Sequence, residues 1–264
     1  MKQIELGELI LERENKKIYH NHEDDLLIKV FNHEKVSKSE VLFEALHSSY
    51  IENIGLNVPV LKEVFPVDDD YALAYNFIKG ETLQERMDKD PKNKKKYIET
   101  LVKLQLEVLS KSVPALPKLK DKLNAKISFC GKEQAQIKLD ATVRYDLHVR
   151  LEGMKDHTKL CHGDFIPSNI ICGDDGKYYI LDWAHACKGN ASADAARTYL
   201  QFVIDGDQKA ADEYLKIFCK KADIAIQYVQ NWISVIAATL LNSVKGDENK
   251  IAILLKNINV VEFC

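Results

Sequence analysis

The sequence predicts an α+β protein of two lobes, in which a small antiparallel β-sheet with one helix precedes a larger, mainly α-helical part. Short apolar runs separated by turns rich in Asn, Asp and other charged residues fill most of the first 78 residues, and such runs are typical of antiparallel strands. Apolar residues at helical spacing predominate afterwards, apart from one turn-rich segment at 161–183. We therefore expect an N-terminal lobe over residues 1–78 and a C-terminal lobe over residues 79–264.

The N-terminal lobe is expected to begin with three strands, at the apolar runs 9–11, 17–19 and 26–31. Charged segments containing Asn and Asp separate these runs, which predicts a turn between each pair of strands. Two further strands are expected at 64–65 and 71–77, because an acidic turn lies between them.

One helix is predicted in this lobe, from about residue 39 to residue 53, because apolar side chains recur there three or four residues apart. Ser37 or Ser39 precedes the pattern, and either hydroxyl is suited to capping the first turn. Gly55 follows the pattern and is expected to end the helix.

The C-terminal lobe is expected to start with a helix at Leu83. Thr82 is suited to its N-cap, and Glu85 stands at the third position, as in a capping box. The later helices are predicted at 97–109, 116–127, 134–152 and from 193 to the end, with breaks near Gly206, Ala222 and Gly246.

Composition excludes several classes of protein. Of the 264 residues 46% are hydrophobic, and the net charge is −3, so nothing favours binding to nucleic acid or to an anionic membrane. The six cysteines form no CxxC pair, which favours reduced thiols. The N-terminus does not resemble a signal peptide, and the longest apolar run, 232–241, is too short to span a bilayer. We expect a cytoplasmic monomer or dimer.

The segment from Cys161 to Trp183 carries the polar residues of greatest interest. It contains His162-Gly163-Asp164, then Asn169 five residues after the aspartate, then Asp182 thirteen residues later. In magnesium-dependent phosphoryl transfer, one Asp accepts the proton of the attacking hydroxyl, while an Asn and a second Asp hold the metal. The pattern therefore predicts Asp164 as the base and Asn169 and Asp182 as magnesium ligands, since Mg²⁺ prefers oxygen ligands.

These motifs resemble the aminoglycoside phosphotransferase and choline kinase group, distant relatives of protein kinases, over nearly the whole chain. The resemblance implies a bilobal protein-kinase-like fold. It also implies that His162 orders the catalytic loop through hydrogen bonds, with a catalytic role as the alternative. The segment Gly189 to Arg197 is similar to a family motif whose Asp accepts hydrogen bonds from that loop, and Asp194 is the matching residue.

The resemblance also implies a nucleotide site in the N-terminal lobe. Lys29, in an apolar strand, matches the lysine that touches the α and β phosphates, and Glu44 is its expected partner, with Glu40 as the alternative. The Asn76 carbonyl and the Ile78 amide would pair with the purine, with ATP as the default nucleotide and GTP as the alternative.

The loop that would cover the nucleotide, between the first two expected strands, has no glycine. Asn15 tolerates a left-handed turn, and its amide would then contact phosphate together with that of Lys16. A plain charged hairpin tip is the alternative.

The family implies a small-molecule acceptor with a hydroxyl group, such as an aminoglycoside or an amino alcohol. Candidate contacts for a cationic acceptor are an acidic set in the helical lobe, a set of aromatic rings, and the acidic C-terminus, represented here by Glu262. The acidic set is Asp205, Asp207, Asp212 and Glu213, and the aromatic set is Trp183, Tyr199, Tyr214, Tyr228 and Trp232.

Two departures from the family pattern leave a second reading open. Ile166 stands where relatives usually have a second His, and the covering loop lacks glycine. The alternative function is a nucleotide-binding regulatory module with little or no catalysis. A third reading, a kinase that acts on proteins, is disfavoured because no APE-like segment or activation loop lies between Asp182 and Asp194.

Overall fold

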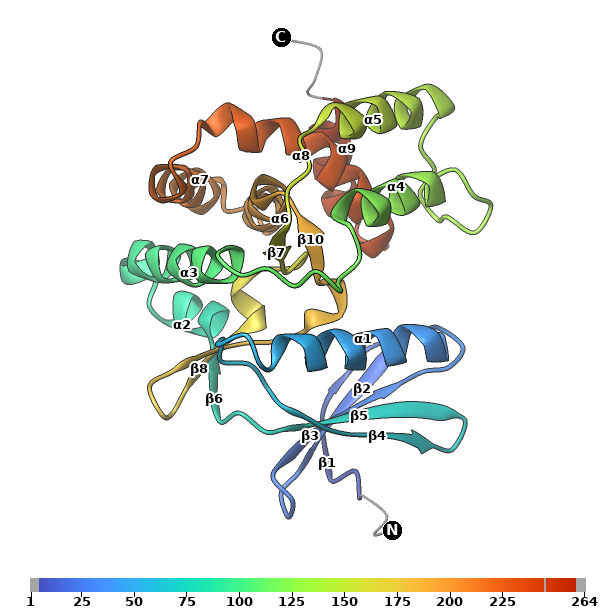
Figure 1. Ribbon diagram of the computed structural model, residues 1–264, viewed down its shortest axis with the longest axis vertical. Coiled ribbons are helices and arrows are strands. Elements are labelled where there is room, and N and C mark those ends of the chain that lie inside the picture. The colour runs from blue at the N-terminus through green and yellow to red at the C-terminus, as the bar shows by residue number, and fades with distance from the viewer. Residues whose placement is uncertain (1–4, 245, 260–264) are drawn as a thin grey trace. The chain divides into compact units, whose positions relative to one another are not determined.

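The structure, a computed structural model, describes residues 5–244 and 246–259. Two compact units make up the chain (Figure 1). The first contains the residues up to 86 together with 167–185, and the second contains 87–166 and the residues from 186 onward. The turn-rich segment after the expected catalytic loop thus packs with the first unit. The division into lobes at residues 78 and 79 stays a prediction.

The first unit is built on a five-stranded antiparallel sheet in the order β1-β2-β3-β5-β4. Each expected strand is present, with slightly different ends, because ladder pairing extends beyond the apolar runs. The strands are β1 Glu8–Glu12, β2 Lys16–Asn21, β3 Leu26–Phe31, β4 Leu61–Val67 and β5 Asp70–Asn76.

Helix α1 (Lys38–Ile51) packs on one face of this sheet (Figure 1). Side chains alternate between the two faces of a strand, so β3 and β5 each contribute to two apolar clusters. The cluster shared with α1 comprises Phe31, Val41, Ala45, Leu73 and Tyr75, and the opposite cluster comprises Ile28, Val30, Ala72 and Ala74. Lys29 therefore faces α1.

A capping box fixes the start of α1. Ser37 is the N-cap; its hydroxyl accepts from the Glu40 amide at 3.3 Å, and the Ser37 amide donates to the Glu40 carboxylate at 2.8 Å. These bonds satisfy amides that the helix leaves without partners. They also engage Glu40 at the helix end, one turn before Glu44.

The rest of the first unit is a three-stranded sheet with two short 3-10 helices. The strands are β6 Gly80–Thr82, β8 Ile170–Gly173 and β9 Tyr178–Ile180, and the 3-10 helices are η2 Pro167–Asn169 and η3 Trp183–His185. Helix α2 (Leu83–Lys89) follows β6. The predicted capping box at its start is confirmed, because Thr82 and Glu85 exchange hydrogen bonds of 2.7 and 3.1 Å.

The second unit is mainly helical, as expected. Its α-helices are α3 Lys94–Leu109, α4 Leu119–Phe129, α5 Ala141–Gly153, α6 Ala191–Ile204, α7 Gln208–Ala222, α8 Ile226–Leu240 and α9 Glu248–Asn259. Two 3-10 helices, η1 Pro91–Asn93 and η4 Leu241–Ser243, and the antiparallel strand pair β7 Lys159–Cys161 and β10 Cys187–Gly189 complete it. Helix α6 packs against α7 and α8, and α8 packs against α4 and α9. No helix in the described ranges is both long and apolar enough to cross a membrane.

The helix expected over 134–152 is shorter than predicted. Residues 134–140 are not helical, and α5 begins at Ala141 because the Asp140 carboxylate accepts from the Thr142 amide at 2.7 Å. The Leu139 amide donates to the Cys130 carbonyl at 2.9 Å, which turns the chain back toward α4. The apolar pattern was correct for α5, but a side-chain cap and a tertiary hydrogen bond make the helix begin later than predicted.

Candidate functional site

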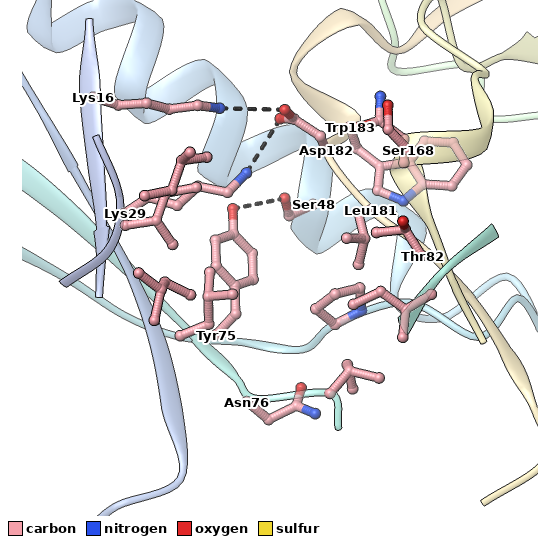
Figure 2. Close-up of a pocket in the computed structure, with 18 of the residues that line it drawn as sticks. Lys16, Lys29, Ser48, Tyr75, Asn76, Thr82, Ser168, Leu181, Asp182 and Trp183 are labelled. Atoms are coloured by element: carbon pink, nitrogen blue, oxygen red, sulfur yellow. Dashed lines mark hydrogen bonds and ion pairs between the residues drawn. The ribbon is translucent and has the colours of Figure 1, made fainter. Parts of the chain in front are cut away.

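A pocket of about 300 Å³ opens in the first unit, between the large sheet and the segment 168–183 (Figure 2). Apolar side chains form much of its wall, among them Ile10, Ile18, Leu27, Ile171 and Leu181. Of the residues expected to bind nucleotide or metal, those that line it are Lys29, Asn76, Ile78, Asn169 and Asp182. A charged end and an apolar end thus meet in one pocket.

Lys29 is held between two carboxylates. Its ammonium lies 2.7 Å from Glu44 Oε1 and 3.2 Å from Asp182 Oδ1, and 5.4 Å from the centre of the Tyr75 ring. Burial opposes the charge of Lys29, but Asp182 and Glu44 outweigh it and raise the pKa of the ammonium above its ordinary value. The structure therefore pairs Lys29 with Glu44, while Glu40 caps α1.

A second lysine, which the sequence analysis did not select, also reaches Asp182. The Lys16 ammonium lies 3.2 Å from Asp182 Oδ2 (Figure 2) and is largely buried. Burial opposes ionisation of Asp182, but Lys29 and Lys16 hold the pKa of its carboxyl well below the usual range. Alternation along β2 was a usable signal, because Lys16 and Ile18 both face the pocket, whereas Lys17 is exposed and pairs with Glu12.

Asn15 does not occupy the place expected for it. It is exposed, is not among the residues that line the pocket, and does not adopt a left-handed backbone. Its carbonyl accepts from the Asn32 amide at 3.1 Å, which ties the hairpin tip to the end of β3. The residues of this turn that do line the pocket are Arg13 and Lys16, and the Lys16 ammonium reaches Asp182.

Asn76, at the end of β5, and Ile78 line the same pocket. The Asn76 side chain accepts from the Val60 amide at 2.6 Å, and the Asn76 amide donates to the Val60 carbonyl at 3.1 Å. The Ile78 amide makes no hydrogen bond with any residue in the described ranges.

Tyr75, which also lines the pocket, is hydrogen-bonded to Ser48 at 3.1 Å, and burial raises its pKa to about 12, so its hydroxyl stays protonated.

Asn169 and Asp182 both line the pocket. The Leu181 amide donates to the Asn169 carbonyl at 2.8 Å, which links the two segments that carry them. Within residues 5–244 and 246–259 no group of three or more His, Cys, Asp or Glu side chains could hold a metal. One carboxylate and one amide still fit Mg²⁺, which keeps several waters and takes its other ligands from phosphate.

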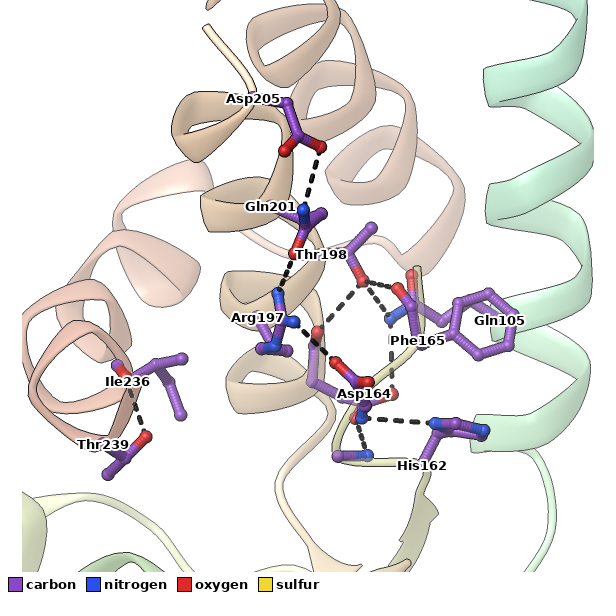
Figure 3. Close-up of polar contacts among 12 residues, drawn as sticks. Gln105, His162, Asp164, Phe165, Arg197, Thr198, Gln201, Asp205, Ile236 and Thr239 are labelled. Carbon is purple, nitrogen blue, oxygen red and sulfur yellow. Dashed lines mark hydrogen bonds and ion pairs between the residues drawn. The ribbon is translucent and has the colours of Figure 1, made fainter. Parts of the chain in front are cut away.

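The segment His162 to Phe165 lies in the second unit, and one face of α6 holds it (Figure 3). Asp194 accepts from the Gly163 amide at 2.7 Å, and Thr198 donates to the Phe165 carbonyl at 2.6 Å. Arg197 pairs with Asp164 at 2.6 Å. The three α6 residues are spaced i, i+3 and i+4, which places them on one helix face.

Buried polar groups surround this loop. His162 is fully buried, and its ring accepts from the Asp164 amide at 3.2 Å. Asp194 also accepts from Gln105 at 3.3 Å. Burial raises the pKa of Asp194 above its ordinary value, although His162 and the Gly163 amide oppose the shift. The sequence motif pointed to Asp194 and His162, but Gln105 and Thr198 carried no motif signal.

Replacing Thr198 by valine is expected to lower the free energy of unfolding by about 1–3 kcal/mol, because the buried Phe165 carbonyl loses its donor. Thr100→Val is the matched control, since the exposed Thr100 hydroxyl only donates to the carbonyl four residues earlier, at 3.1 Å. Denaturant unfolding of both variants measures the difference. Equal losses would show that the bond to Phe165 adds nothing to stability.

The acidic residues proposed for a cationic acceptor are engaged with their own neighbours. Asp207 pairs with Lys94 at 2.7 Å and Glu213 with Lys95 at 2.8 Å. Asp205 and Asp212 each accept from a glutamine on the same helical stretch. Among the proposed aromatic contacts, Trp183, Tyr214 and Trp232 are buried, and Trp183 also lines the pocket of the first unit. Glu262 lies outside the described residues.

Comparison with protein families gives a match to the model described as the phosphotransferase enzyme family, over residues 9–226. Comparison with curated proteins gives no match.

Solved structures similar to this one include two kinds of kinase. A thermostable mutant of the aminoglycoside phosphotransferase APH(4)-Ia, in a ternary complex with AMP-PNP and hygromycin B, has a TM-score of 0.68 and 14% identity, covering 95% of this chain and 90% of that one. The choline kinase LicA from Streptococcus pneumoniae has a TM-score of 0.66 and 13% identity, covering 97% and 93%. At these identities the likeness shows the fold, and the expected kinase-like fold is confirmed.

Proposed function

Because the chain belongs to the phosphotransferase enzyme family, we propose that it transfers the γ-phosphate of ATP to a hydroxyl group of a small molecule. The observation that carries this proposal is the buried chain of charges from Glu44 through Lys29 to Asp182, in a pocket that Asn169 also lines. A lysine and a metal-binding carboxylate at one end of an apolar pocket are the parts that hold nucleotide phosphates in kinases.

In this proposal the pocket of the first unit holds the nucleotide. The apolar side chains accommodate the base, and the Ile78 amide and the Asn76 carbonyl pair with its edge. Lys29 and Lys16 contact the phosphates. Similar structures solved with AMP-PNP or with AMP support a nucleotide as the ligand. ATP is the expected donor and GTP the alternative, because backbone groups do the pairing.

Asp164 is proposed as the residue that accepts the proton of the acceptor hydroxyl. Arg197 pairs with one oxygen of its carboxylate, Asp194 accepts from the Gly163 amide, and the His162 ring accepts from the Asp164 amide. Asn169 and Asp182 would hold Mg²⁺, which neutralises the charge that develops on the phosphate oxygens. Positioning and electrostatic stabilisation supply most of the catalysis in reactions of this type.

The proposal is tested by measuring ADP formation from ATP with a panel of aminoglycosides, amino alcohols, hydroxy acids and sugars. We expect acceptor-dependent turnover that requires Mg²⁺ and stops when EDTA is added. Nucleotide binding without phosphate transfer to any acceptor would instead favour the regulatory module. Phosphate incorporated into proteins, but into no small alcohol, would favour a protein kinase.

Replacing Lys16 by glutamine is expected to raise the KM for ATP by about tenfold, since one charge-assisted contact with phosphate is worth about 1.5–3 kcal/mol. Lys17→Gln removes the same charge from the neighbouring residue, whose side chain is exposed and pairs with Glu12. Steady-state kinetics measures the KM for ATP of both variants. Equal KM values for ATP would exclude Lys16 from the phosphate site.

A further inference from the structure

A glutamine on α3, Gln105, lies at the centre of a buried polar network in the second unit. Its amide nitrogen donates to Asp194 Oδ2 at 3.3 Å and to Thr198 Oγ1 at 3.1 Å (Figure 3). Its amide oxygen accepts from the hydroxyl of Tyr214, on α7, at 2.5 Å. All four residues are buried. The network therefore joins α3, α6 and α7 through hydrogen bonds that are shielded from water, where the loss of one partner is costly.

This single amide contacts both of the α6 side chains that hold the loop of the proposed base. Asp194 accepts from the Gly163 amide at 2.7 Å, and Thr198 donates to the Phe165 carbonyl at 2.6 Å. Gly163 and Phe165 are the residues on either side of Asp164 in the sequence. Because both anchoring side chains bind one NH2 group, the glutamine fixes them relative to each other and, through them, the loop.

The orientation of the amide follows from the donors and acceptors around it. Thr198 uses its one hydroxyl proton to donate to the Phe165 carbonyl, so its oxygen accepts from Gln105. Turning the amide by 180° would place its oxygen against two acceptors, the Thr198 hydroxyl and the Asp194 carboxylate. Tyr214 favours the observed orientation because its hydroxyl donates to the amide oxygen, and burial raises the pKa of this hydroxyl, which stays protonated.

We propose that Gln105 is a positioning residue for phosphate transfer, which holds the loop so that Asp164 meets the hydroxyl of the acceptor. Tyr214 supports this role by fixing the orientation of the amide. The inference rests on the proposed function, since it concerns the base of the same reaction. Gln105 acts through Asp194 and Thr198 rather than on the reacting atoms, and a displacement of about 1 Å in a catalytic group can lower a rate by about 10²-fold.

Replacing Gln105 by methionine tests the proposal, because methionine keeps an unbranched side chain but makes none of the three hydrogen bonds. The full-length protein is assayed with Mg·ATP and the aminoglycosides, amino alcohols, hydroxy acids and sugars of the panel. We expect kcat for the best acceptor to fall by about 10–10²-fold. The KM for ATP should stay largely unchanged, because the nucleotide pocket is built from residues of the other unit.

Ile98→Ala is the control for a general loss of stability. Ile98 is buried on α3, seven residues before Gln105, which is about 10 Å along the helix. Denaturant unfolding of both variants compares their stability. Ile98→Ala should be destabilised like other large-to-small core substitutions but should keep the kcat of the parent protein at a temperature at which all the proteins are folded.

A double variant tests whether Tyr214 acts through Gln105. Tyr214→Phe should lower kcat in the parent protein but should have no further effect in the Gln105→Met variant, where no amide remains to be oriented. Tyr145→Phe is the control, because Tyr145 is exposed on α5. Losses of kcat that simply add in the double variant would overturn the role assigned to Tyr214.

Hydrogen exchange of the Gly163 amide measures the loop without any turnover. This amide is bonded to Asp194, so its exchange should be about 2–10-fold faster in Gln105→Met, the effect of losing one hydrogen bond from the network. Mass spectrometry of the peptide that contains Gly163 gives the rate. Ile98→Ala corrects for exchange that proceeds through global unfolding.

The outcomes separate this inference from the function on which it rests. Failure of the proposed function would appear as an absence of Mg²⁺-dependent phosphate transfer by the parent protein, whatever the exchange rate of Gly163. Phosphate transfer by the parent protein, combined with an undiminished kcat in Gln105→Met, would overturn the positioning role and leave the kinase intact. Equal losses of kcat in Gln105→Met and Ile98→Ala, or equal exchange rates of Gly163 in these two variants, would also overturn it.

Discussion

Replacing Asp164 by asparagine is expected to lower kcat by about 10²–10⁴-fold, the usual contribution of a well-placed general base, while the KM for ATP stays largely unchanged. Asparagine has the same size as aspartate and still offers an oxygen to Arg197, so the loop keeps its geometry. Its amide does not accept a proton at neutral pH. The loss should therefore fall on the chemical step, because the nucleotide pocket is built from residues of the other unit.

The Asp164→Asn variant is also expected to be less stable, because Arg197 loses its charged partner. Its guanidinium lies 2.6 Å from the Asp164 carboxylate and is largely buried, and a buried charge that loses its partner costs stability. Denaturant unfolding of Asp164→Asn should accompany the kinetics. Asp212→Asn serves as the control, because Asp212 is exposed on α7 and only accepts from Gln208. A folded Asp164→Asn variant with undiminished kcat would remove Asp164 from the role of base.

The fold was largely predictable because the local sequence patterns, apolar runs and helix caps, agree with the way the elements pack in the structure. The apolar run at 26–31 located β3, whereas the face that carries Lys29 became clear only from the two apolar clusters of the structure. The capping box formed by Ser37 and Glu40 set the start of α1, so Glu44 falls on the turn that meets Lys29. Where a tertiary contact overrode the local pattern, as at residues 134–140, the prediction was wrong.

The site was predictable only where a motif named the residue. Asp194 was found through its motif. Arg197 ends the same motif but was given no role, and Thr198 lies outside it, although both contact the loop. At the turn that contains Asn15, the residues that line the pocket are Arg13 and Lys16, and the phosphate contact expected for the Asn15 amide stays a prediction.

Replacing Asp182 by asparagine is expected to lower turnover by at least about 10²-fold, the size of effect seen when one electrostatic contact to a transition state is removed. Asparagine keeps an oxygen but loses the charge that Mg²⁺ prefers. The same change releases two ammonium groups, since Lys29 and Lys16 each lie 3.2 Å from Asp182. Both would then be available to ATP phosphates without competition from a protein carboxylate.

The Asp182→Asn variant should therefore bind ATP more tightly without Mg²⁺ but turn over more slowly with it. This combination distinguishes the loss of a metal ligand from the loss of folded structure. In EDTA, Asp182→Asn should bind ATP more tightly than the parent protein, because phosphate replaces the missing carboxylate beside Lys29 and Lys16. With Mg²⁺, its turnover should be low and should require a higher metal concentration. Asp174→Asn is the control, since Asp174 lies in an exposed turn 3.6 Å from Lys79. A misfolded protein would lose both activities, and an unchanged Mg²⁺ requirement would show that Asp182 does not hold the metal.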